Sequence, residues 1–133
     1  MSGVLAEMSQ KGFVDVTVQR KFYPQIAQHW ERQLTGRNAA KWGRIWIDPS
    51  SVEKDKRRRE NLWEEGPSTR GLPQANRDEC PGAMFICETQ EYAHVEVCCE
   101  TQNQAFGRDL FRALQKELGK KMGWWEVRFH FVD

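Results

Sequence analysis

The sequence lacks the patterns of a membrane protein and of a strongly charged binding protein. No run approaches the roughly 20 consecutive apolar residues of a transmembrane helix, and the first residues show no basic segment followed by an apolar one. Its 20 basic and 19 acidic side chains leave a formal net charge of +1. We therefore expect a cytoplasmic protein without a membrane partner, whose overall charge is too small to attract nucleic acid unless a local basic patch does so.

Motifs of common catalytic and metal sites are missing as well. The chain has no glycine-rich phosphate loop, no His-Glu-x-x-His segment and no nucleophile accompanied by an oxyanion loop. Its four cysteines have no Cys-x-x-Cys spacing, which disfavours zinc, and we expect them to pack in the core: Cys80, Cys87, Cys98 and Cys99. We predict no catalytic residue, no metal and no cofactor, and the sequence favours a protein that is not an enzyme.

The length of 133 residues predicts a single domain with a substantial core. Residues 1–12 show no periodicity and are expected to be a loose lead-in. Residues 66–81 are expected to form one long loop, because regular structure is broken at Pro67, Gly71, Pro73 and Pro81.

Apolar periodicity predicts the elements between these segments. Strands are predicted over 13–22 and 42–48, at 84–88 and 93–100 as a hairpin, and from Trp124 to Phe131. Helices are predicted from Pro24 to Gly36, over the highly charged residues 53–65, and over 103–118, where an apolar stripe comprises Phe106, Leu110, Phe111, Leu114 and Leu118. The order β-α-β-α-β-β-α-β predicts a two-layer α+β sandwich, with an antiparallel or mixed sheet of about five strands and its helices on one face.

Of all the predicted strands, the terminal one, from Trp124 to Phe131, has the most regular alternation of side chains between two faces. Trp125, Val127, Phe129 and Phe131 point to one side, which we expect to be the core, because successive side chains of a strand face opposite ways. The other side gathers aromatic and charged residues typical of binding surfaces. The predicted binding residues are Arg44, Trp46, His94, Glu96, Trp124, Glu126, Arg128 and His130.

Two other interpretations stay open. Histidines 94 and 130 with glutamates 96 and 126 are chemically suited to acid–base catalysis or to a metal site if their strands are neighbours. The dense basic run offers phosphate contacts, although a solvated helix with internal ion pairs is the slightly favoured explanation. The run comprises Lys54, Lys56, Arg57, Arg58 and Arg59.

Residues 78–130 resemble the C-terminal half of the translation initiation factor 4E-like fold, whose members bind the messenger RNA cap. The shared marks are Asp78-Glu79-Cys80, Gly82-Ala83, Arg112 and Leu118-Gly119, and Gly43-Arg44-Ile45-Trp46 is similar to the strand before that family's middle helix. The resemblance implies a curved sheet backed by helices. Cap binding does not follow, because Glu88, Gln90 and Glu91 stand where the family has basic residues for the cap phosphates.

From these features we expect a non-enzymatic binding or regulatory module, most simply an inhibitor-like protein that acts on a protein partner through its mixed sheet face. A homodimer using the same face is a variant of this hypothesis. The alternatives are binding of single-stranded nucleic acid or a nucleotide by tryptophan stacking and the basic run, and a small-molecule enzyme that uses the His/Glu pairs.

Overall fold

The computed structural model describes residues 2–64 and 67–133 and confirms an α+β fold with a mixed sheet. The strands are β1 (Val4–Met8), β2 (Val14–Gln19), β3 (Ile45–Ile47), β4 (Ala75–Cys80), β5 (Phe85–Cys87), β6 (His94–Cys99) and β7 (Glu126–Val132). The α-helices are α1 (Pro24–Leu34), α2 (Ala39–Trp42), α3 (Ser51–Glu64) and α4 (Glu100–Leu118), and short 3-10 turns occupy Arg20–Phe22, Gly36–Asn38 and Gly119–Lys121.

Five strands form the main sheet in the order β1-β2-β7-β3-β5. Strands β1 and β2 are an antiparallel hairpin, β7 lies parallel to β2, and β3 pairs antiparallel with both β7 and β5. The terminal strand therefore joins the hairpin to the β3–β5 pair at the middle of the sheet. The register places Val14 beside Val127, Val16 beside Phe129 and Val18 beside Phe131.

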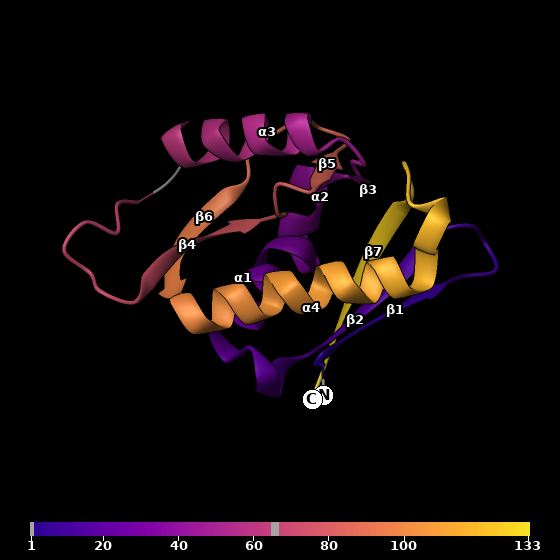
Figure 1. Ribbon diagram of the computed structural model, residues 1–133, viewed down its shortest axis with the longest axis horizontal. Helices are drawn as coiled ribbons and strands as arrows, with labels where there is room; N and C mark the ends of the chain where they lie inside the picture. The colour runs from indigo at the N-terminus through magenta and orange to yellow at the C-terminus, as the bar shows by residue number, and fades with distance from the viewer. Residues whose placement is uncertain (1, 65–66) are drawn as a thin grey trace.

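The core lies between the apolar side of this sheet and helices α1 and α4 (Figure 1). Val14, Val16 and Val18 are fully buried there. Trp30 of α1 packs edge-on against Phe106 of α4 and Phe129 of β7, with ring centroids 4.9 and 5.4 Å away. Burial of one such aromatic side chain contributes about 1.5–3 kcal/mol to folding.

Strands β4 and β6 form a separate antiparallel small sheet. Opposite residues share a face, so Asp78, Cys80, His94 and Glu96 point to the side that contacts α1. The other side receives α3, where Asn61 donates a hydrogen bond to Glu79 and accepts one from the amide of Ala93. Helix α3 lies along one end of the molecule (Figure 1).

Local sequence explains where the helices begin and end. Pro24 occupies the first turn of α1, where its missing N–H is not needed. The hydroxyl of Ser50 accepts a hydrogen bond from the amide of Glu53 and so caps α3. Gly119 follows α4 with a φ of +49°, a left-handed conformation that favours glycine. The predicted start of α1 at Pro24 and the predicted end of α4 at residue 118 are confirmed, whereas α3 begins two residues before its predicted start.

Several sequence predictions are wrong. The expected loose lead-in over 1–12 contains β1, and the expected long loop over 66–81 contains β4, although residues 65 and 66 lie outside the described residues. The expected hairpin of 84–88 with 93–100 does not form, because β5 pairs with β3 and β6 pairs with β4. Phe111 of the predicted stripe is exposed.

None of the helices within residues 2–64 and 67–133 combines the length and apolar character needed to cross a membrane.

Candidate functional site

The side of the main sheet opposite α1 and α4 carries a mixed polar and aromatic surface, which we call the polar face. The register brings its side chains together, since Trp46 lies beside Glu126, Asp15 beside Arg128 and Thr17 beside His130. It also extends onto the edge strands through Leu5 and Glu7 of β1 and Ile86 of β5. Six of the eight predicted binding residues lie in these strands or within two residues of them, namely Arg44, Trp46, Trp124, Glu126, Arg128 and His130.

Several polar side chains of the polar face contact one another. His130 contacts Asp15 at 2.7 Å, and the Arg128 guanidinium donates to Glu126 at 3.0 Å while covering the Phe13 ring. Such exposed pairs contribute about 0–1 kcal/mol each to stability. Their more important effect is to fix charge positions before any partner arrives, which lowers the ordering cost of binding.

Arg44 lies at the border of the polar face. Its guanidinium donates to Glu88 at 2.9 Å and lies 5.2 Å from the centre of the Trp46 ring. This hydrogen bond lowers the pKa of Glu88 below its usual range, so the carboxylate stays ionised at neutral pH.

The two tryptophans predicted as binding residues differ in exposure. Trp46 is half-buried, whereas Trp124, two residues before β7, is 60% exposed. Leu5 of β1 and Val132 of β7 add further exposed apolar surface. An exposed indole among arginine and histidine side chains is typical of protein interfaces.

His94 and Glu96 do not join this surface. They belong to β6 of the small sheet, whereas Glu126 and His130 belong to β7 of the main sheet. The expectation that one sheet face carries all four residues is therefore wrong, because the predicted hairpin that would have placed β6 in the main sheet does not form.

His94 and Glu96 instead belong to a second group of residues, the histidine cluster, formed by His29, Asp78, His94 and Glu96. The Nδ1 of His29 lies 2.7 Å from Asp78, and its Nε2 lies 2.8 Å from Nδ1 of His94. Trp30 donates to the other oxygen of Asp78 at 3.1 Å. Because a carboxylate only accepts hydrogen bonds, Asp78 fixes the proton of His29 on Nδ1 and leaves Nε2 facing His94.

Sequence reasoning missed His29 and Asp78. His29 lies beside Trp30 on the buried side of α1, and its helical spacing from Ile26 and Gln33 marks it as a polar residue on an apolar face. Asp78 lay in the segment expected to be a loop, so nothing indicated that it would be buried opposite α1. Only the pairing of β4 with β6 reveals this group of residues.

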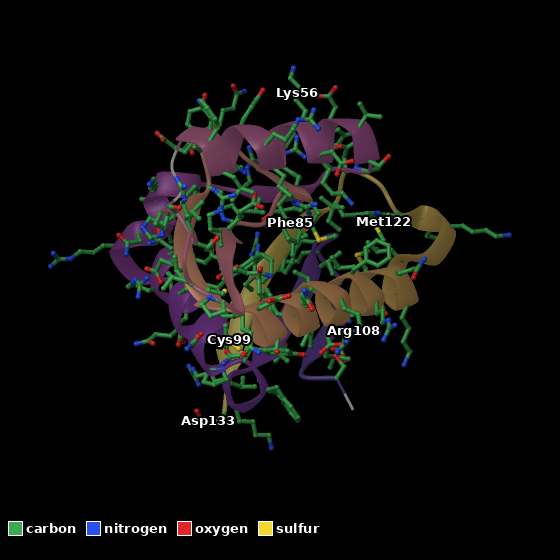
Figure 2. All side chains as sticks on the ribbon, turned by 60° about the vertical axis from the view of Figure 1, so that its left-hand side comes forward. Lys56, Phe85, Cys99, Arg108, Met122 and Asp133 are labelled. Atoms are coloured by element: carbon green, nitrogen blue, oxygen red, sulfur yellow. The ribbon has the colours of Figure 1, made fainter. Side chains whose placement is uncertain are left out.

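The side chains of the basic run, residues 54–59, point in different directions around helix α3. Arg57 is used internally, where it donates to the Asp48 carboxylate at 2.7 Å and to the carbonyl of Ala83. Arg58 lies 3.5 Å from the carboxylate of Glu79. Lys56 points away from the rest of the molecule (Figure 2). The five cations therefore do not form one continuous phosphate-binding surface.

A pocket of about 510 Å³ lies between α3, β4 and α4. Its apolar lining includes Trp30, Phe85 and Phe106, and Lys54, Arg58 and Arg77 supply cationic groups. Glu79 also lines the pocket, and burial raises its pKa. The volume is in the range of small-molecule sites, which are mostly apolar with a few polar groups.

No protein-family model matches the sequence, and a comparison with curated proteins finds no significant match. Functional arguments therefore rest on the geometry of the polar face, the pocket and the histidine cluster.

Proposed function

We propose that this protein is a non-enzymatic binding module that docks a protein partner on its polar face. The observation that carries the proposal is the sheet surface on which Trp46 lies beside Glu126, near Arg128 and His130, with the exposed Trp124 two residues before β7. Interfaces concentrate their binding energy in such tryptophan and arginine residues.

The charges of the polar face favour a protein over a nucleic acid. Glu7, Asp15 and Glu126 lie on this surface among the cations, and they would repel a phosphate backbone. A protein partner offers both signs of charge and therefore complements such a surface. We infer a partner that places an apolar side chain on Trp124 and polar groups of both signs on the neighbouring ion pairs.

The test begins with a photo-reactive amino acid placed at position 124, expressed in the cells that contain the protein. We expect a discrete crosslinked adduct from position 124 and none from position 56, which lies on the outward side of α3. The partner recovered in this way is then titrated against purified variants. An adduct of twice the chain mass would identify the homodimer.

Dissociation constants of surface variants show whether the partner binds to the polar face or elsewhere on the surface. We expect Trp124→Ala and Arg128→Glu each to weaken partner binding by about thirtyfold, the effect of losing one interface hot spot of about 2 kcal/mol. Lys56→Ala is the matched surface control and should leave the dissociation constant unchanged. Unchanged affinity in both polar-face variants would contradict the proposal, and steep loss of affinity for short RNA with rising salt would favour nucleic-acid binding instead.

A further inference from the structure

We propose that His29, His94 and Glu96 form a binding site for a divalent transition-metal ion of the zinc class. His29 comes from α1, and His94 and Glu96 come from β6. One ligand atom from each residue lies within 4.8 Å of the other two. The site is on the small sheet, so it is separate from the polar face and does not depend on the function proposed for it.

Asp78 supplies a second, independent indication of a metal site. Metal-binding histidines commonly donate their other ring nitrogen to a carboxylate, which fixes the tautomer and the direction of the lone pair. Here Nδ1 of His29 lies 2.7 Å from Asp78, and both residues are buried. The remaining nitrogen of His29, Nε2, is thereby aimed at His94, where the ion would lie.

The spacing of the two imidazoles requires only a small adjustment. Their facing nitrogens lie 2.8 Å apart, which is a hydrogen-bond distance. Two nitrogens bound to one tetrahedral ion at about 2.0–2.1 Å stand roughly 3.3 Å apart. Binding therefore requires the proton of His94 to move from Nδ1 to Nε2. It also requires the two rings to turn until both lone pairs meet at the ion, while the facing nitrogens separate by about 0.5 Å.

Glu96 can supply the third ligand from the exposed side of the cluster. Its carboxylate now pairs with Arg32, and its side chain is 38% exposed. A dication competes well with an exposed ion pair, because such a pair contributes only about 0–1 kcal/mol. Turning the carboxylate from Arg32 to the ion would complete a His₂Glu set with one position left for water.

The donor chemistry selects the class of ion. Imidazole nitrogens suit zinc, cobalt, nickel and copper, whereas magnesium and calcium prefer sites made of oxygen ligands. Two nitrogens and one carboxylate oxygen match the ligand sets of zinc sites with an open coordination position. We therefore use Zn²⁺ and Co²⁺ as probes.

Calorimetric titration with Zn²⁺ and visible spectroscopy with Co²⁺ test the site in the full chain. We expect one equivalent to bind, with the intense visible absorption of tetrahedral Co²⁺ and without the near-ultraviolet band of Co²⁺–thiolate bonds. His94→Ala and Glu96→Gln should each weaken binding at least about tenfold, and Asp78→Asn about 10–100-fold. Thermal unfolding without metal identifies any variant that fails to fold.

Two control variants distinguish this site from surface binding. His130→Ala removes the exposed histidine of the polar face and should leave metal affinity unchanged, as should Cys99→Ser on the same strand as the ligands. Absence of saturable binding would overturn the proposal. So would binding that survives both His94→Ala and Glu96→Gln, or that is lost with Cys99→Ser.

Discussion

At the residue scale, Asp78 is a buried carboxylate that connects several elements of the fold. It accepts hydrogen bonds from His29 of α1 and from the indole of Trp30, and it also borders the pocket between α3 and α4. One buried carboxylate thus ties the small sheet to the helix that packs on the main sheet. No residue of the polar face has a comparable structural role, because the ion pairs there are exposed.

We expect Asp78→Asn to lower the free energy of unfolding by about 2–3 kcal/mol, because the amide cannot accept from both donors as a charged carboxylate does. Asp15→Asn is the matched control, since Asp15 also pairs with a histidine but is only half-buried. The Asp15→Asn substitution should lower the free energy of unfolding by about 0–1 kcal/mol. Urea denaturation measures both values, and equal losses would contradict the role assigned to Asp78.

Sequence reasoning recovered the polar face better than the histidine cluster for a physical reason. Alternation within one strand predicts which side chains share a face, and β7 shows this for Glu126, Arg128 and His130. The cluster instead depends on contacts between residues 29, 78 and 94, which are brought together only by tertiary packing. No local pattern encodes such contacts.

At the scale of elements, the sequence predictions that are wrong concern strands without a partner nearby in the sequence or without a clear apolar pattern. Strand β4 has the sequence Ala-Asn-Arg-Asp-Glu-Cys, which has almost no apolar side chains, yet β6 and helices on both sides hold it in place. Strand β1 alternates over only five residues. Helix α3 forms in the region predicted to be helical. Trp63 of this helix is 85% exposed, and the helix docks through Asn61 and Arg57.

Two neighbouring substitutions test the role of β1. Ala6 is buried against α4, whereas Leu5 points outward on the polar face. We expect Ala6→Asp to reduce the free energy of unfolding by about 3–5 kcal/mol, because it buries an uncompensated charge. Leu5→Asp should change it by less than about 1 kcal/mol. If residues 1–12 were a loose lead-in, both variants would unfold at the same urea concentration as the parent protein.

At the scale of the whole molecule, the α+β class was predictable, because helical and strand periodicities are strong over α1, α4, β2 and β7. The prediction of an antiparallel or mixed sheet of about five strands fits the mixed main sheet, but it counted β6 and omitted β1. The division into two sheets was not, since it depends on which strands pair across long stretches of chain. The resemblance of residues 78–130 to the translation initiation factor 4E-like fold stays a prediction.

Stability should decline in alkaline solution. Burial raises the pKa of Tyr23 and of Cys98 to about 12, and it raises that of Cys80 well above the ordinary value of a thiol. For each group the unfolded chain releases its proton at lower pH than the native state does, so the unfolded state binds fewer protons. The stabilisation that these protonated groups contribute to the folded state is complete below about pH 9 and is lost progressively toward pH 12.

Urea unfolding from neutral to alkaline pH measures this effect. Tyr23→Phe combined with Cys98→Ala should give a flatter profile above pH 9, whatever its stability at neutral pH. A parent protein whose free energy of unfolding stays constant across this range would contradict the assigned burial of the three groups.

Because β7 lies at the centre of the main sheet, the chain can be divided into two fragments, one of which carries this strand. Its backbone pairs with β2 on one side and with β3 on the other, so the strand fills a slot between the β1–β2 hairpin and the β3–β5 pair. A polypeptide lacking this strand would retain both walls of the slot, and a separate peptide carrying it would meet hydrogen-bonding groups on both flanks. The chain is therefore suited to a two-fragment complementation system, in which a short peptide restores the sheet and brings with it Glu126, Arg128 and His130 of the polar face.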